Sequence, residues 1–76
     1  MFNYRVIKTV DKMGVVFYAI YGVYYNCAKT PDSWHKEPEY PFGYTLKDLK
    51  SNYHEISKAL DRPVLEIIDG KLKGCK

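Results

Sequence analysis

Apolar and polar residues alternate along the first part of the chain in the way that β-strands require. Residues 4–10 (YRVIKTV) are rich in β-branched and aromatic residues, and residues 15–25 continue that composition over a longer run. Between them, residues 11–14 (DKMG) have the composition of a turn and end in Gly14, a residue type that tolerates positive φ. The pattern predicts an antiparallel hairpin.

The second of these strands is apolar on both sides. One set of side chains comprises Val15, Phe17, Ala19, Tyr21, Val23 and Tyr25, and the other comprises Val16, Tyr18, Ile20 and Tyr24. A single helix can cover only one set, and the sequence leaves open which one. The other set must face water, a second copy or another protein, unless lysine stems and loop residues cover it. Because a contiguous exposed apolar patch usually marks an interaction surface, we expect a binding face on this strand.

Two shorter strands are predicted further along the chain. Residues 33–37 form the first of them and are closed by Pro38, which cannot donate to a ladder, so we expect this strand at a sheet edge. Residues 64–68 (VLEII) have the composition of a final strand, and the Asp-Gly pair at 69–70 ends it in a turn.

The strongest local signal is a helix in the second half of the chain. Its apolar residues recur at spacings of three and four and are Leu46, Leu49, Tyr53, Ile56 and Leu60. The hydroxyl of Thr45 can cap the first turn, and Asp48 occupies the acidic position of a capping box. Tyr44 precedes the cap at the position of a hydrophobic staple, and Pro63 stops the helix. The spacing predicts a helix of about four turns with one apolar stripe.

Together these elements predict an α+β fold. We expect a three- to four-stranded, mainly antiparallel sheet with one helix packed on one face, in the order β-β-β-α-β. The 76 residues have room for one domain, 1–76, with an ordered core over about 4–68 and a basic tail over 69–76. So short a domain has a thin core, which a disulfide, a metal or a second subunit usually supplements.

Charge and cysteine content narrow the class of protein. Twelve basic against nine acidic residues give a net charge of +3, and no Lys or Arg occurs between positions 15 and 26, so nucleic-acid binding is disfavoured. The most apolar stretch falls well short of the roughly 20 residues of a membrane helix. Cys27 and Cys75 fit no CxxC pattern. We expect a cytoplasmic protein with reduced thiols, and we leave a disulfide between the two cysteines open.

Catalytic chemistry has little support in the sequence. His35 and His54 are candidate acid–base groups by their ordinary pKa, but no motif places a nucleophile beside either of them. Cys27 could join the two histidines at a metal only with a spacing that matches no zinc pattern. We therefore expect no enzymatic activity, no bound metal and no cofactor.

Aromatic residues are unusually frequent. Eight Tyr, three Phe and one Trp make up 16% of the chain, more than a core of this size can hold. Tyr and Trp bury a large area at low entropic cost and dominate the hot spots of protein interfaces. The predicted partner-binding residues are Tyr18, Ile20, Tyr24, Trp34, Tyr40 and Tyr44.

A family resemblance accompanies this pattern. Residues 41–49 (PFGYTLKDL), running into Asn52, Glu55 and Leu60, resemble the Gly-x-Thr-x-x-Glu-Ala/Leu helix entry of HicB-like antitoxin domains. The predicted hairpin from Tyr4 onwards is similar to the one that opens those domains. The resemblance implies a partly RNase H-like β-β-β-α-β fold over about 4–68. RNase H-like enzymes need a cluster of acidic residues on their central strands, and the predicted strands carry almost none. The chain also resembles small uncharacterised bacterial and phage proteins.

The first functional hypothesis is a non-enzymatic protein-binding module, an inhibitor of the antitoxin type that occludes a small toxin or nuclease. A homodimer through the spare face of residues 15–25 or through an edge strand is consistent with the thin core. The second hypothesis is a phage-encoded, anti-CRISPR-like inhibitor of a host defence protein. An RNA-binding domain that uses the tyrosines and the basic tail is the third, and a small hydrolase is a distant fourth.

Overall fold

The N-terminal third of the chain folds into the predicted hairpin. In the computed structural model, which describes residues 1–74, β1 (Phe2–Val10) pairs antiparallel with β2 (Val16–Tyr25) along its whole length. The Asp11 carboxylate closes the turn, because it accepts hydrogen bonds from the amides of Met13 (2.8 Å) and Val15 (2.9 Å). Gly14 adopts a φ of 80°, a conformation that favours glycine.

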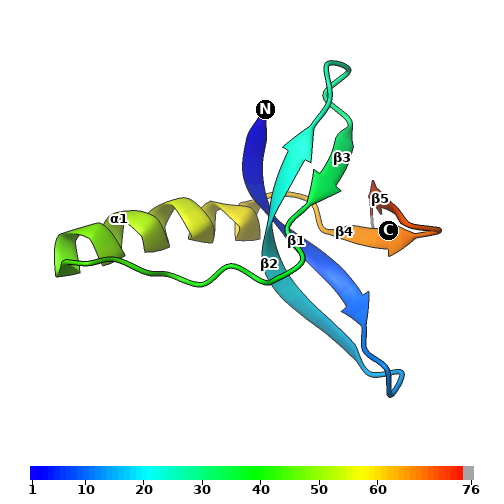
Figure 1. The fold of residues 1–76 in the computed structure, drawn as a ribbon, viewed down its shortest axis with the longest axis horizontal. Helices are drawn as coiled ribbons and strands as arrows, with labels where there is room; N and C mark the ends of the chain where they lie inside the picture. Colours follow the sequence, from blue (N-terminus) through cyan, green and yellow to red (C-terminus); the bar gives the residue numbers. More distant parts are fainter. Residues whose placement is uncertain (75–76) are drawn as a thin grey trace.

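Five strands form one sheet in the order β3-β2-β1-β4-β5 (Figure 1). The remaining elements are β3 (Pro31–Trp34), α1 (Leu46–Ser57), the short 3-10 helix η1 (Lys58–Asp61), β4 (Leu65–Ile68) and β5 (Lys71–Gly74). β4 lies parallel to β1, with Ile7 opposite Leu65, while every other pairing is antiparallel. The sheet curls so far that its two edge strands, β3 and β5, approach each other, and it forms a nearly closed barrel.

The predicted sheet of three to four mainly antiparallel strands is therefore wrong. The additional strand, β5, comes from residues 69–76, which were expected to form a basic tail. Asp69 and Gly70 have φ values of 51° and 76°, so they make a tight two-residue reversal between β4 and β5. Asp-Gly is a strong hairpin signal, and here it returns the chain into the sheet instead of ending it. Cys75 and Lys76, and with them the question of a disulfide, lie outside the described residues.

β3 lies at the sheet edge, as expected, but earlier in the chain than residues 33–37. The side-chain oxygen of Asn26 accepts hydrogen bonds from the amides of Ala28 (2.9 Å) and Thr30 (3.1 Å), which makes a tight turn directly after β2. Pairing with β2 therefore begins already at Pro31.

The core fills the concave side of the curled sheet. It consists of Ile7, Tyr21, Val23, Leu65 and Leu72, with Ala19, Tyr25 and Trp34 packed against it. The core residues that β2 supplies all belong to one of its two sets of side chains, the set that alternates with Val16, Tyr18, Ile20 and Tyr24. The structure thus decides which set of the second strand is inside, a question that the sequence left open.

The prediction that the helix covers one face of the sheet is also wrong. Ile56 is the only buried residue of α1, and the helix extends away from the sheet over most of its length (Figure 1). Ile56 and Ala59 of η1 are buried at its root, where η1 contacts β1. Val6 is buried on the convex side of β1, opposite in direction to the core residue Ile7, so we infer that the root of the helix covers Val6.

The core is small, so its largest fully buried side chains should dominate the stability of the fold. We expect Ile7→Ala to lower the free energy of unfolding by about 3 kcal/mol, because Ile7 is fully buried and a cavity would remain. Val10→Ala, on the same strand but 61% exposed, is the matched control and should cost less than about 0.5 kcal/mol. Urea titration followed by circular dichroism measures both values, and equal losses would contradict this assignment of the core.

Candidate functional site

A projecting arm is the most distinctive feature of the molecule. We define the arm as residues 40–53, which comprise an extended segment (40–45) and the first eight residues of α1. All of its large apolar side chains are exposed, and these are Tyr40, Phe42, Tyr44, Leu46, Leu49 and Tyr53. Tyr44 is 91% exposed and Leu46 66%, values close to those of an unfolded chain. Leu46, Leu49 and Tyr53, which we call the arm stripe, belong to the predicted apolar stripe of the helix but lie beyond the sheet.

The two halves of the arm hold each other in place. The amide of Phe42 donates to the side-chain oxygen of Asn52 (2.9 Å), and the amide of Asp48 donates to the hydroxyl of Thr45 (3.1 Å), which confirms the predicted cap. A Cβ atom at Gly43 would collide with the backbone of the helix at residues 48–49, so only glycine permits this close approach. The arm is thus a preformed unit, although an isolated helix of this length is marginal in water.

A chain of three polar groups fixes the base of the arm. Tyr24 Oη lies 3.1 Å from His35 Nε2, and His35 Nδ1 lies 2.7 Å from Glu39 Oε1. The ring of Phe2 packs beside those of Tyr24 and His35, with centroid distances of 4.9 and 5.7 Å. The amide of Glu39 also donates to the carbonyl of Ile20 (2.8 Å), so the chain is held against β2 before it leaves the sheet.

In space, the tyrosine hydroxyl, the imidazole and the carboxylate follow the order of a nucleophile, its base and the group that orients the base. Sequence reasoning missed this arrangement, because it joins β2 to a loop through a contact that no spacing rule encodes. None of the three residues lines the cleft between β1 and β4, the hollow on the arm or the groove between β3 and β5. These three residues, Tyr24, His35 and Glu39, therefore hold the base of the arm against β2, and we call them the clamp. Nearby, burial raises the pKa of the Tyr4 hydroxyl, and the carboxylates of Glu39 and Glu55 act in the same direction.

A second apolar surface lies on the convex side of the β1–β2 hairpin. Val10 pairs directly with Val16, and Lys8 pairs with Tyr18, so these side chains share one face. Val10, Val16 and Tyr18, which we call the hairpin patch, are 61%, 48% and 60% exposed. The root of the helix covers this face near Val6 and leaves the hairpin patch exposed.

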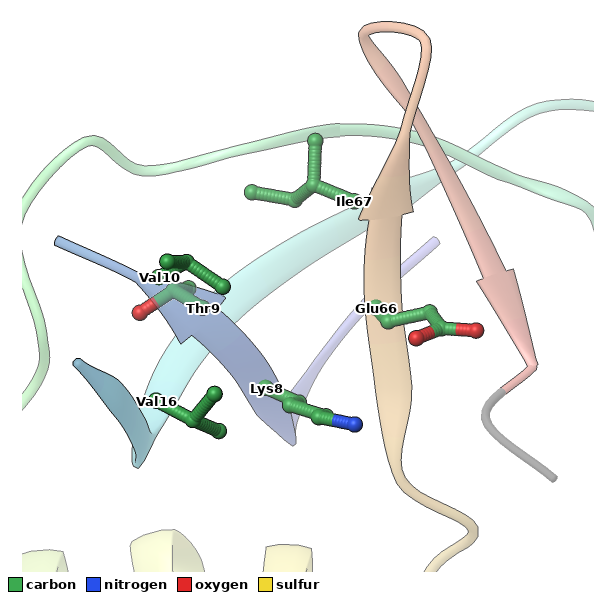
Figure 2. Close-up of a pocket in the computed structure, with 6 residues that line it drawn as sticks. All are labelled: Lys8, Thr9, Val10, Val16, Glu66 and Ile67. Carbon is green, nitrogen blue, oxygen red and sulfur yellow. The ribbon is translucent and has the colours of Figure 1, made fainter. Parts of the chain in front are cut away.

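A cleft adjoins the hairpin patch where β1 and β4 diverge. The two strands pair only through Ile7 and Lys8, and beyond these residues they separate. Figure 2 shows the six residues that line the opening: Lys8, Thr9, Val10, Val16, Glu66 and Ile67. The hydroxyl of Thr9 is buried and has no hydrogen-bond partner among the described residues. A hollow of about 290 Å³ on the arm itself is almost entirely apolar and is lined by Pro41, Leu49, Lys50 and Tyr53.

The structure distributes the predicted binding residues over several regions. Tyr40 and Tyr44 lie on the arm, and Tyr18 lies in the hairpin patch. Tyr24 is 44% exposed and belongs to the clamp, and Ile20 is half-buried beside it. The sixth, Trp34, is half-buried and packs against the core, so it offers little contact area. Phe42 was not predicted as a binding residue. Leu46, Leu49 and Tyr53 were not predicted either, because the helix stripe was assigned to the protein's own core.

Comparison with models of protein families, with curated proteins and with solved structures finds no match. Among residues 1–74, no helix is both long and apolar enough to cross a bilayer. In the same part of the chain, no three His, Cys, Asp or Glu side chains gather in a way that could hold a metal ion.

The close approach at Gly43 can be tested by amide hydrogen exchange. We expect Gly43→Ala to push the extended segment off the helix at a cost of about 1–3 kcal/mol, because the new methyl group meets backbone atoms that cannot yield. The Phe42 amide, which donates to Asn52, should then exchange at least about tenfold faster. Gly74→Ala is the control, since its Cβ would meet nothing within 4 Å. Unchanged exchange at Phe42 would contradict the stapled arm.

The clamp makes a separate prediction. We expect His35→Ala to speed exchange of the Glu39 amide about tenfold, because the substitution removes the contacts of the imidazole with Tyr24 and Glu39 at a cost of about 1–2 kcal/mol. His54→Ala, on the exposed side of α1, should leave that amide unchanged. If both variants affect the Glu39 amide equally, the clamp has no role in holding the arm.

Proposed function

We propose that this chain is a non-enzymatic protein-binding module and that the arm is its contact surface. One observation carries the proposal: the apolar stripe of α1 continues past Ile56 into solvent, where no part of its own sheet covers it. A surface rich in exposed Leu, Phe and Tyr has the composition of an interface core. Because the arm is held together internally, binding would cost less ordering entropy than the folding of a loose segment.

The chemistry of the arm favours a protein over the other classes of ligand. The hollow on the arm is shallow and offers few polar groups to orient a small molecule. The residues of the arm stripe are uncharged, and Lys50 is the one basic residue that lines the hollow beside them, whereas a site for nucleic acid places several basic side chains among its aromatics. The clamp has the order of a nucleophile and its base, but it lies at none of the clefts described above.

Within this class we expect an inhibitor of the antitoxin type that occludes a small toxin or nuclease. A phage-encoded inhibitor of a host defence protein would use the same surface and remains the alternative, and RNA binding is the third. We place the module in the cytoplasm.

Photo-crosslinking in the host cell tests the proposal. Tyr53 in the arm stripe is replaced by p-benzoylphenylalanine, which keeps an aromatic ring at the position, and the exposed His54, about 100° further around the same turn, is replaced as the matched control. Ultraviolet irradiation should give a discrete protein adduct with the probe at position 53 and none at position 54. No adduct at position 53, or the same adducts at both positions, would overturn the proposal.

A further inference from the structure

A single copy is more extended, and exposes more surface, than a compact protein of the same mass. Its radius of gyration is 13.2 Å, whereas a compact chain of this length should have about 11 Å. Its accessible surface is 5894 Å², whereas a compact monomer of this mass should expose about 4,800 Å². The excess of about 1,100 Å² is comparable with the roughly 800 Å² that each partner contributes to a standard protein interface. One copy thus leaves about one interface uncovered.

The same chain carries a surface that suits the uncovered arm. The helix stripe already packs on the convex side of the sheet at its root, where Ile56 and Ala59 are buried together with Val6. The hairpin patch continues that convex side along β1 and β2, and its side chains are exposed. The uncovered helix and the uncovered sheet are therefore extensions of one helix-on-sheet contact that the fold already makes.

The dimensions of the two surfaces agree. From Leu46 to Tyr53 the arm stripe is about 10 Å long at 1.5 Å per residue. From Val16 to Ile20, where cover by the root begins, the strand is about 13 Å long. Figure 1 shows α1 and the β1–β2 turn at opposite sides of the molecule, so one twofold rotation can place the arm of each copy over the hairpin of the other.

The charges permit two copies to meet there. The arm stripe and the hairpin patch contain no ionisable group apart from tyrosine hydroxyls, and the nearest cation on the sheet, Lys8, has Glu66 as its register partner. The net charge of +3 on each copy is carried elsewhere and is screened within about 8 Å at physiological ionic strength. A strongly charged partner would find no complementary charge on either surface.

We propose that the occupant of the arm is a second copy of this chain. Two copies exchange arms across a twofold axis, and each arm stripe lies on the hairpin patch and the adjoining cleft of the other copy. This inference rests on the proposed function, because it names the partner of the same arm.

Sedimentation equilibrium of the full chain and its variants tests the exchange. The wild-type protein should have twice the 8.9 kDa of the single chain. Leu46→Glu in the arm stripe and Val16→Lys in the hairpin patch should each raise the dimer dissociation constant at least about tenfold, because each brings an unpaired charge into both contacts. The matched controls are Ser51→Glu on the opposite side of α1 and Met13→Lys in the exposed hairpin turn, and both should remain dimeric. Circular dichroism confirms that each variant is folded.

Mixing the two weakened variants separates arm exchange from other modes of dimerisation. In the mixed dimer, one arm–sheet contact is native and the other joins the introduced Glu to the side that carries the introduced Lys. We therefore expect the mixture to dimerise more tightly than either variant alone. A wild-type monomer at millimolar concentration, a dimer insensitive to both substitutions, or a mixture no tighter than its components would overturn the proposal. A monomer that still gives the position-53 adduct with another protein would overturn arm exchange alone and leave the proposed function standing.

Discussion

The attachment of the helix at a single point determines the shape of this molecule. Ile56 and Ala59 bury the root of the helix near Val6, and beyond that point the helix has left the sheet. Two arginines on either side of the junction reinforce the root: Arg62 donates to the carbonyl of Tyr4 (2.9 Å), and Arg5 donates to that of Pro63 (3.1 and 2.7 Å). The exposure of the arm stripe follows from this attachment, because an amphipathic helix fixed only at its end must expose the rest of its stripe.

Local chemistry in the sequence predicts much of the fold. Thr45 caps the helix as expected, and the Asp11–Gly14 turn connects the two predicted strands. The order of the strands and the position of the helix depend on contacts between distant residues, which periodicity does not report. The same period-3.6 stripe describes a helix that lies on its own sheet and one that projects from it, so the sequence could not distinguish the two. The fifth strand is different, because the Asp-Gly pair at 69–70 did signal a hairpin.

The candidate site, like the fold, was predicted only in part from the sequence. Tyrosine abundance pointed to exposed aromatic residues, and Tyr40 and Tyr44 do lie on the arm. The aliphatic part of the surface was not predicted, since Leu46 and Leu49 have the spacing of ordinary core residues. The clamp of Tyr24, His35 and Glu39 could not be predicted at all, because tertiary structure alone brings its members together. A small domain with a thin core commonly gains stability from association, and an arm that offers apolar area to a partner fits that need.

Isotope-filtered nuclear Overhauser spectroscopy tests most directly whether the arm stripe avoids its own sheet. In a mixture of labelled and unlabelled protein, our account predicts contacts from the Leu49 methyl groups to the ring of Tyr18 only between a labelled and an unlabelled chain. In labelled protein diluted into a large excess of unlabelled protein, contacts within one labelled chain should be absent. If the Leu49 methyl groups contact the ring of Tyr18 within a single chain, the helix folds back onto its own hairpin, and the projecting arm does not exist in solution.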